Sequence, residues 1–518
     1  MNILPVSDIR EADLYTIKTE PIADIDLMER AALTCCRWIE QHLVGGERLK
    51  FFCGSGNNGG DGLAIARMLV QKRWPVEIFL ASDAGPCSSN CKINYERLLR
   101  AGEASAGEGG SAPLGAPVTV LSNELPLPDI PATDIVVDAV FGNGLTRPVT
   151  GFFEKLIRHI NQSGARIISI DVPSGFFCDS TNHRVSDPVV VKADYTLTFS
   201  PPKLGFFFPE NDRFTGNWQL LDIGLREEFI ASRAVKNILL TKEDCQRMLK
   251  KRAKFAHKGN FGHALIMAGS EGKMGAAILA ARGCLKSGAG LVSVKAPRCG
   301  TVILQTAVPE AMSLIGTEDE VIAGIPALSA YNAIAIGPGI GRNSKTAVAL
   351  KLLIQQSTVP LVVDADAINL LSENKTWLGF LPHGSVLTPH IKEFERIAGK
   401  SSNDFERNDR QREFSFKYQS YVVLKGAHTA ITTPEGLCYF NTTGNPGMAT
   451  GGSGDVLTGI ITGLMAQGYT SLESCLLGVY LHGLAGDLAL LQEGYEALVA
   501  SDIIHYLGKS FQTLYGKL

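Results

Sequence analysis

The sequence predicts two fused α/β domains. The chain has 518 residues, which exceeds the roughly 250–300 residues at which a single hydrophobic core stops growing. In both halves, short apolar runs alternate with Gly/Asp turns and helical patterns, as they do in parallel βαβ units. From about Leu225 to Asp244 the glycines disappear and charged residues become denser, which is typical of a boundary. We therefore predict an N-terminal domain over residues 1–225, a linker over 226–244 and a C-terminal domain over 245–518.

Composition limits the partners that the chain can have. Hydrophobic residues make up 45% and charged residues 19% of the chain, which is typical of a globular protein with ample core. The formal net charge of -3 offers no basic field for nucleic acid or an anionic membrane. The first residues lack a basic segment followed by an apolar run, and about 18 uninterrupted apolar residues occur nowhere. We expect a cytoplasmic protein, without membrane or nucleic-acid partners, that binds small molecules and forms a homo-oligomer.

The 11 cysteines are scattered, without the paired spacing of a disulfide framework or a zinc site. Several lie inside apolar runs and are predicted to be reduced core thiols: Cys35, Cys36, Cys284 and Cys475. Cys87 and Cys91 are four positions apart, as on one face of a helix, but no second Cys/His pair follows nearby. We therefore predict no metal site there.

The N-terminal half begins with an amphipathic helix that closes at Gly45–Gly46. Its apolar residues recur every four positions: Leu27, Ala31, Cys35, Ile39 and Leu43. Buried strands are predicted at three places: Leu49–Cys53, Ile135–Val140 and Arg166–Asp171. Residues 101–117 are rich in Gly, Ala and Ser and are predicted to form a surface loop, to which we assign no function.

A glycine-rich segment, Gly54–Gly62, follows the first strand and opens the helix Leu63–Leu69. Glycines let backbone amides approach a phosphate, and a helix N-terminus adds partial positive charge. Two asparagines interrupt the segment, and no acidic residue ends a second strand about 20 residues later. The segment therefore differs from the Gly-x-Gly-x-x-Gly fingerprint of hydride cofactors, and we predict an anion-binding cradle.

Polar turns follow the other two strands, at Asp138–Gly144 and Asp171–Gly175. Because the C-terminal strand ends of a parallel sheet converge on one crevice, five polar residues are expected to share a pocket: Asn58, Asp61, Asp138, Asp171 and Ser174. Their hard oxygens also suit a monovalent or divalent cation. The alternative, that the aspartates only cap helices, stays open for each one singly and is less favoured for all three together.

Together, Asn57–Gly62, Asp138–Gly144 and Asp171–Gly175 resemble the YjeF N-terminal family, the NAD(P)H-hydrate epimerases, over nearly the whole N-terminal half. The resemblance implies a three-layer α/β/α Rossmann-like fold, and a potassium ion bound with the help of Asn58, Asp138 and Ser174. It also implies the residues that contact the hydrated nucleotide: Asn57, Asn58, Gly59, Gly60, Asp61, Gly142, Asn143, Gly144, Leu145, Thr146, Arg147, Pro148 and Asp171. A carboxylate can transfer a proton in both directions, and we predict Asp171 as the catalytic acid/base. Which aspartate moves the proton stays open.

The C-terminal half opens with a predicted strand, Ala264–Ala268, and a helix of small residues over Gly275–Lys286. Further along, Asn445–Asp455 places glycines around a polar turn, just before the apolar helix Val456–Ile461. Amides at such a helix start would face a transferring phosphoryl group, and Asp455 would accept the proton of an attacking hydroxyl. The segment therefore predicts phosphoryl transfer, with an accidental helix-capping turn as the alternative.

The Gly-x-Gly-Asp arrangement resembles the ribokinase-like superfamily, and Asn445–Met448 narrows the resemblance to the ADP-dependent NAD(P)H-hydrate dehydratases. Other segments are distributed as in that family: His257–Gly259, Gly269–Ser270, Gly275–Ala276, Gly337–Gly341, Asp364–Ala367, Thr388–His390 with Glu393, and Lys425–Thr429. The resemblance implies that the adenine nucleotide is bound by Lys425, Gly426, Ala427, His428, Thr429 and Gly454. It further implies that the hydrate pocket is lined by Ala276, Gly339, His390 and the catalytic Asp455.

The implied reaction phosphorylates the carbon-bound hydroxyl with ADP, after which phosphate leaves as the ring double bond re-forms and AMP is released. Magnesium would bridge the nucleotide oxygens. No residue decides between ADP and ATP as the donor, or between NADH and NADPH. Two alternatives stay open: a small-molecule kinase joined to an accessory domain, and a non-catalytic binding scaffold. Retention of Asp61, Asp138, Asp171 and Ser174 argues against the scaffold.

Overall fold

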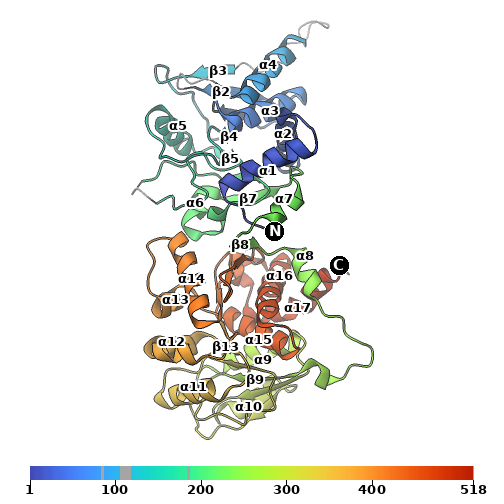
Figure 1. Ribbon diagram of the computed structural model, residues 1–518, viewed down its shortest axis with the longest axis vertical. Helices are drawn as coiled ribbons and strands as arrows, with labels where there is room; N and C mark the ends of the chain where they lie inside the picture. The colour runs from blue at the N-terminus through green and yellow to red at the C-terminus, as the bar shows by residue number, and fades with distance from the viewer. Residues whose placement is uncertain (83–86, 105–117, 184–186, 517–518) are drawn as a thin grey trace. The chain divides into compact units, whose positions relative to one another are not determined.

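The computed structural model describes residues 1–82, 87–104, 118–183 and 187–516 (Figure 1). The chain divides into two compact units: Asn2–Val235 with Asn403–Phe405, and Lys236–Ser402 and Glu406–Leu518 with Met1. The division after Val235 falls inside the segment 226–244, whose residues form elements of both units. Helix α7 (Glu227–Ser232) lies in the N-terminal unit, and β8 (Asn237–Leu239) and α8 (Lys242–Met248) lie in the C-terminal unit.

The N-terminal unit is built on one parallel sheet, whose strand order in the described residues is β3-β2-β1-β4-β5-β6-β7. Its strands are β1 (Leu49–Cys53), β2 (Val76–Ala81), β3 (Val118–Leu121), β4 (Ile135–Ala139), β5 (Arg166–Ile170), β6 (Tyr195–Phe199) and β7 (Asn217–Leu221). Its other helices are α1 (Val6–Thr19), α2 (Asp24–His42), α3 (Asn57–Gln71), α4 (Ser89–Ala104), α5 (Gly151–Gln162) and α6 (Asp212–Thr215). The chain order reverses at β1, which pairs with β2 on one side and β4 on the other. Such a switch point opens a crevice at the C-terminal strand ends.

Helices cover both faces of this sheet, which confirms the predicted three-layer fold. Every residue of β1 is buried, as expected for a strand between two helical layers. Phe51 belongs to the core that the sheet forms with α1 to α4, whereas Phe52 belongs to the core that it forms with α5. Figure 1 shows α5 on the side of the strands opposite α2 and α3. The predicted loop over 101–117 is helical up to Ala104, where α4 ends, and its remaining residues lie outside the described ones.

Helix α3 begins at Asn57, so the prediction that the helix begins at Leu63 is wrong. The glycines serve close packing instead of a turn. A Cβ at Gly59 would lie 1.7 Å from the carbonyl oxygen of Gly54, and a Cβ at Gly62 would lie 2.6 Å from the Cβ of Ala139. The first turns of α3 can therefore lie directly against the ends of β1 and β4, where no side chain would fit.

The C-terminal unit contains a mixed sheet with the strand order β11-β10-β9-β12-β13-β14-β15-β16-β17-β8 in the described residues. Its strands besides β8 are β9 (His263–Met267), β10 (Leu291–Lys295), β11 (Met312–Leu314), β12 (Ala333–Ile336), β13 (Leu361–Val363), β14 (Val386–Leu387), β15 (Tyr421–Leu424), β16 (Ala430–Thr432) and β17 (Cys438–Phe440). Pairing is antiparallel at β15–β16 and β16–β17 and parallel elsewhere. The predicted α/β class of this half is confirmed.

The helices of the C-terminal unit besides α8 are α9 (Met274–Lys286), α10 (Gly300–Ala307), α11 (Ser344–Gln356), α12 (Ala365–Glu373), α13 (Ile391–Ala398), α14 (Asp404–Tyr418), α15 (Ser453–Ala466), α16 (Ser471–Ala497) and α17 (Ala500–Leu514). Side chains of α9, α15, α16 and α17 share one core with one face of the sheet. By length and composition, α16 is the described helix that could cross a membrane. Leu477 and Leu481 in α16 are fully buried in that core, and Gly494 interrupts the helix with a φ of 74°.

The cysteines are mostly buried. Cys35, Cys36, Cys284 and Cys475 are buried free thiols, which confirms the prediction of reduced core residues. Burial raises the pKa of Cys284 and of Cys475 well above the ordinary value, so both thiols stay protonated. Within the part of the chain that the structure describes, no three His, Cys, Asp or Glu side chains gather in a group that could hold a metal.

We expect Gly59→Ala to destabilise the N-terminal unit, because the added methyl group would overlap the Gly54 carbonyl and overpacking costs about 1–3 kcal/mol or more. The free energy of unfolding in urea, followed by the fluorescence of Trp38 and Trp218, should fall accordingly. The matched control is Gly45→Ala, since nothing lies within 4 Å of a Cβ there. Equal stability of the two variants would contradict the close packing of α3 on β1.

Candidate active sites

A cavity of about 580 Å³ opens in the N-terminal unit at the switch point of the sheet. It is lined by residues that follow β1, β4 and β5, as the convergence of strand ends predicts. The predicted ligand-contacting residues that line it are Asn57, Asn58, Asp61, Gly142, Asn143, Gly144, Leu145 and Asp171. The predicted residues that do not line it are Gly59, Gly60, Thr146, Arg147, Pro148, Asp138 and Ser174.

Asp171 stands directly after β5 with a backbone φ of 63°, a conformation that L residues rarely adopt. Its Oδ1 lies 2.8 Å from the Nζ of Lys203, whose side chain is 1% exposed. Its Oδ2 accepts a hydrogen bond of 3.0 Å from the backbone N–H of Asn143. Lys203 is oriented in turn by donating to the Thr198 hydroxyl at 3.0 Å and the Phe199 carbonyl at 2.8 Å. Asp171 is thus held as one member of a buried ion pair at the wall of the cavity.

Lys203 is a site residue that sequence reasoning missed. It follows β6, a strand that the sequence analysis did not identify, although residues 196–199 alternate threonine with apolar side chains. Asp13, from α1, was also missed and lines the same cavity. No motif surrounds either residue.

Two further carboxyls in this cavity favour their protonated forms. Burial, with Asp171 nearby, raises the pKa of Asp13 to about 7, although Lys203 opposes the rise. Burial, Asp171 and Asp13 raise the pKa of Asp61 well above its usual range. The cavity therefore combines an ion-paired carboxylate with carboxyl groups that can hold a proton at neutral pH.

Asp138 and Ser174 lie behind the cavity wall and are fully buried. The Asp138 carboxylate accepts hydrogen bonds from the Ser169 hydroxyl at 2.8 Å and from the Ser174 N–H at 2.8 Å and hydroxyl at 2.5 Å. Burial nevertheless raises the pKa of Asp138. Asn58 differs, because its side-chain amide is buried and neither its oxygen nor its nitrogen has a hydrogen-bond partner among the described residues. Such an unsatisfied buried amide can bind a ligand, a water molecule or an ion.

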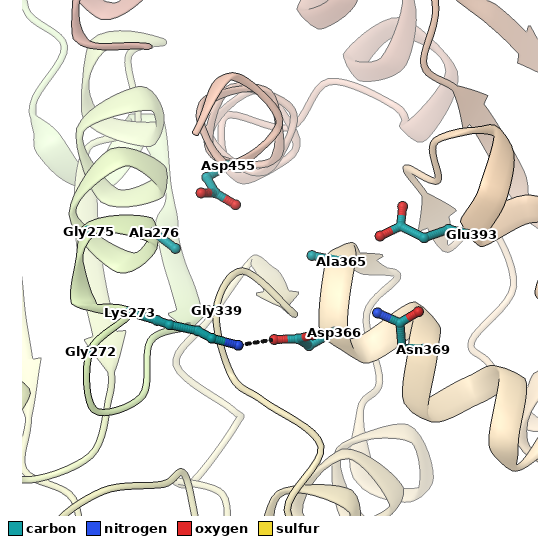
Figure 2. Close-up of a pocket in the computed structure, with 10 residues that line it drawn as sticks. All are labelled: Gly272, Lys273, Gly275, Ala276, Gly339, Ala365, Asp366, Asn369, Glu393 and Asp455. Carbon is teal, nitrogen blue, oxygen red and sulfur yellow. Dashed lines mark hydrogen bonds and ion pairs between the residues drawn. The ribbon is translucent and has the colours of Figure 1, made fainter. Parts of the chain in front are cut away.

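A second cavity, of about 350 Å³, lies in the C-terminal unit among the N-terminal ends of α9, α12 and α15. Figure 2 shows its lining residues: Gly272, Lys273, Gly275, Ala276, Gly339, Ala365, Asp366, Asn369, Glu393 and Asp455. The structure thus brings together the predicted Ala276, Gly339 and Asp455. Lys273 Nζ lies 3.5 Å from Asp366 Oδ2 across the cavity.

Asp455 stands in the first turn of α15, which begins at Ser453 and not at Val456 as predicted. Gly452 caps the helix in the left-handed conformation, with a φ of 96° that favours glycine. Burial, with Asp364 nearby, raises the pKa of Asp455 to about 6, against the opposing charge of Lys425. Above that pH Asp455 is a carboxylate that can accept a proton.

Lys425 lies beside the same turn of α15. Its Nζ is 2.8 Å from Asp364 Oδ1, and the hydroxyl of Thr458 donates to the other oxygen of Asp364 at 2.7 Å. A Cβ at Gly454 would lie 3.3 Å from that Nζ, so the glycine leaves room for the ammonium group. A helix N-terminus with an ammonium beside it can bind a phosphoryl group. Asp364 belongs to a segment that the sequence analysis quoted, but its role in orienting Lys425 was missed.

His390 does not line the cavity. It is the N-cap of α13, where its Nδ1 accepts a 3.2 Å hydrogen bond from the Glu393 N–H, and Glu393 in turn accepts one from the His390 N–H. The spacing of the Thr-Pro-His-x-x-Glu segment therefore serves a capping box. Gly426, Ala427, His428 and Thr429 form the turn between β15 and β16 and do not line the cavity either.

The segment Asn445–Met448 is tied to α16. The side chain of Asp487 accepts hydrogen bonds from the Asn445 amide at 3.0 Å and the Gly444 N–H at 2.9 Å. The Ser453 hydroxyl donates to the Met448 carbonyl at 2.9 Å. The segment therefore positions the start of α15, and Asp487 is a further residue that the sequence analysis missed.

Two protein-family models match the chain in succession. The model described as YjeF-related protein N-terminus matches residues 24–205, and the model described as NAD(P)H-hydrate dehydratase matches residues 264–509. The first match begins after α1 and the second begins at β9.

Curated relatives align over nearly the whole chain. The bifunctional NAD(P)H-hydrate repair enzyme Nnr of Moorella thermoacetica is 35% identical and covers 98% of this chain and 96% of its own length. The enzyme of the same name from Escherichia coli is 30% identical over 96% of this chain and 92% of its own. Among solved structures, the ADP/ATP-dependent NAD(P)H-hydrate dehydratase from Bacillus subtilis, co-crystallised with ATP and Mg²⁺, is 29% identical. It covers 54% of this chain and 100% of its own, with a TM-score of 0.48.

We expect Asp364→Asn to destabilise the C-terminal unit by about 2 kcal/mol. This is less than the roughly 3–5 kcal/mol lost when a fully buried ion pair is broken, because the Lys425 side chain is 23% exposed. Calorimetry of the full chain measures the shift of the unfolding transition. The control is Glu373→Gln, which breaks an exposed pair with Arg342 and should cost less than about 1 kcal/mol. Similar shifts for both variants would mean that Asp364 and Lys425 are not held as a pair.

Proposed function

The chain belongs to the family of bifunctional NAD(P)H-hydrate repair enzymes, as its motifs predicted, and on that basis we propose that it repairs hydrated NAD(P)H in two steps. The N-terminal unit interconverts the R and S epimers of the hydrate. The C-terminal unit dehydrates the S epimer with ADP and releases AMP and phosphate. The observation that carries this proposal is that each unit has its own polar cavity at strand ends, with an acidic residue beside a lysine-bound carboxylate.

The kinase and scaffold alternatives are not favoured. Three relatives named bifunctional NAD(P)H-hydrate repair enzymes align with 96–99% of this chain, so neither half aligns as an unrelated accessory domain. Epimerisation also gives the fusion a purpose, because a dehydratase that accepts one epimer needs the other to be converted. We further propose that the protein acts in the cytoplasm and forms a homo-oligomer. Light scattering of the purified chain would test the oligomeric state.

In the N-terminal site, the hydroxylated carbon beside the ring nitrogen passes through a cationic intermediate during epimerisation. The Asp171 carboxylate, oriented by Lys203 and the Asn143 N–H, stabilises that positive charge and exchanges protons with the substrate. The N-terminus of α3, capped by Gly56, faces the substrate's phosphates with its unpaired amides. This arrangement binds both the ring and the anionic part of a hydrated dinucleotide.

Potassium fits the same site at Asn58. Its buried amide oxygen has no hydrogen-bond partner among the described residues and is a hard ligand suited to an alkali cation. The hydroxyl of Ser174 can turn away from Asp138 and direct lone pairs toward an ion, so Asn58, Asp138 and Ser174 would hold it together. A bound cation supplies positive charge for the substrate's phosphates.

In the C-terminal site, Asp455 takes the proton of the substrate hydroxyl as that oxygen attacks a phosphoryl group. The amides of the first turn of α15 and the ammonium of Lys425 bind the phosphoryl oxygens. Phosphate is a better leaving group than hydroxide, so elimination follows: the carbon–oxygen bond breaks as phosphate leaves, the adjacent ring carbon loses a proton to water, and the ring double bond is restored. The turn Lys425–Thr429 and Gly454 bind the adenine nucleotide. Ala276 and Gly339 contact the hydrate in the cavity, and the exposed side of the His390 ring contacts it from outside the cavity lining.

Magnesium fits this site because the ion needs only one or two protein carboxylates besides the nucleotide phosphates, and Asp366 and Asp455 both line the cavity and would supply them. When bound, it neutralises the negative charge that develops on the transferring phosphoryl group. ADP is proposed as the donor in preference to ATP.

Asp455→Asn should reduce phosphate release from ADP and the hydrate by at least about 100-fold, because an amide cannot accept the hydroxyl proton. Epimer exchange, followed by chromatography of the two epimers, should keep its wild-type rate. Wild-type phosphate release should also fall as the pH is lowered through about 6, where Asp455 becomes protonated. If Asp455→Asn stopped both reactions, the proposal of two separate sites would be wrong.

Replacing potassium by choline should slow epimer exchange and lower the thermal unfolding temperature of the N-terminal unit, since an ion that binds only the folded chain stabilises it. Asn58→Leu, which removes the amide oxygen, should abolish both responses. Asn123→Leu serves as a control, because the Asn123 side chain accepts a hydrogen bond from Lys155 of α5 and does not line the cavity. A potassium response that survives in Asn58→Leu would exclude Asn58 as a ligand.

A further inference from the structure

Helix α1 forms one wall of the N-terminal cavity. Ile9, Arg10 and Asp13 all line the cavity, and their spacing places them on one face of the helix. Ile9 and Ala12 anchor the helix in the core that the sheet forms with α2 and α3. The family model matches residues 24–205, so it does not include α1. Helix α1 is thus a part of the site that no sequence motif indicated.

Asp13 is the one carboxyl that α1 adds to this cavity among the described residues. It is half-buried, and no hydrogen bond or ion pair within the described part of the chain engages it. Several charged groups surround it from other elements: Asp24 of α2, Asp61 of α3, Asp171 after β5 and Lys203 after β6. Arg10 lines the same cavity from α1 itself. A half-buried carboxyl without a partner in a ligand cavity can contact the ligand.

Asp13 and Asp171 differ in their ion pairing. Asp171 is paired with Lys203 at 2.8 Å, and Asp13 is not within ion-pair distance of a cation in the described residues. Burial and the negative charge of Asp171 raise the pKa of Asp13 to about 7. Two carboxyls in one cavity whose environments separate their proton affinities are the usual basis for an acid and a base.

We propose that Asp13 is a catalytic residue of the epimerase reaction, and that it gives a proton to the departing hydroxyl while Asp171 takes one from the water that replaces it. This inference rests on the proposed epimerase function and assigns a second proton carrier to it. Epimerisation needs both groups, because the hydroxyl leaves one face of the ring and water enters from the other.

The Asp13 carboxyl protonates the hydroxyl oxygen, the carbon–oxygen bond breaks with its electron pair on oxygen, and water leaves. The lone pair of the ring nitrogen forms a carbon–nitrogen double bond, so the ring becomes cationic. Water then adds to the carbon from the opposite face and its proton passes to Asp171. The reverse sequence starts with Asp171 protonated and Asp13 ionised, so both directions of epimerisation use the same two groups.

Asp61 is less suited to this role. It also lines the cavity, but burial and the charges of Asp171 and Asp13 raise its pKa well above the ordinary value and favour its protonated form. A proton carrier must exist in both forms to serve both directions of the reaction, which suits Asp13 better. Asp61 instead remains a hydrogen-bond donor to the substrate.

The test compares Asp13→Asn, Asp13→Glu and Asp8→Asn in the full-length protein, with epimer exchange as the readout. Asp8 lies on the same helix and does not line the cavity, so it is the matched control. We expect Asp13→Asn to lower kcat by about 100-fold or more with KM changed less than about threefold, as loss of a general acid does. Asp13→Glu should restore part of the rate. Wild-type exchange should decline as the pH rises through about 7, and Asp13→Asn should lack that decline.

The outcomes separate this inference from the proposed function. If the wild-type protein does not exchange the epimers, the epimerase proposal itself fails. If it does, and Asp13→Asn keeps the wild-type kcat and pH profile, Asp13 is not a proton carrier although the epimerase proposal stands. Because the S epimer is dehydrated in the C-terminal unit, thermal unfolding of the N-terminal unit, compared between Asp13→Asn and Asp8→Asn, reports whether the variant is folded. A rise in KM alone would show that Asp13 only binds substrate and would overturn the inference.

Discussion

In both units, the site depends on a helix that lies closer to its neighbours than any side chain would allow. A Cβ at Gly59 of α3 would overlap the Gly54 carbonyl, and a Cβ at Gly459 of α15 would lie 2.0 Å from the carbonyl oxygen of Ala280 in α9. Gly463, one turn further along α15, would meet the Cys284 carbonyl at 2.6 Å in the same way. These contacts place the N-termini of α3 and α15 at their cavities, where unpaired amides can meet phosphates. The anion-binding ends of the two helices therefore follow from packing.

In both units, a lysine pairs with one carboxylate near the cavity and leaves a neighbouring carboxyl without an ion-pair partner. Lys203 pairs with Asp171, and Lys425 pairs with Asp364. The neighbouring carboxyl has no such partner and bears the cost of burial, so its pKa rises to about 7 in Asp13 and to about 6 in Asp455. In each unit, the lysine therefore leaves one carboxyl ion-paired and its neighbour able to exchange protons near neutral pH.

Backbone strain marks the same two places. Asp171 follows β5 with a φ of 63°, and Ala365 follows β13 with a φ of 48°, although neither is a glycine. Left-handed backbone costs an L residue about 1–2 kcal/mol, which the surrounding sheet must offset. In return, the chain turns sharply at the strand end. Asp171 is thereby brought to the wall of its cavity, and Asp364, next to Ala365, reaches Lys425.

The local patterns of the chain are sufficient for the fold class, for the buried strand Leu49–Cys53, and for the family, because each depends on neighbours in sequence. They also locate Asn58, Asp171 and Asp455 at cavities, since residues after strands and at helix starts converge in any parallel α/β fold. Only the tertiary structure decides that α3 begins at Asn57, that His390 serves as a cap, and that Lys203, Asp364 and Asp13 belong to the sites. Those features arise from contacts between residues far apart in the chain, whose distances no local pattern encodes.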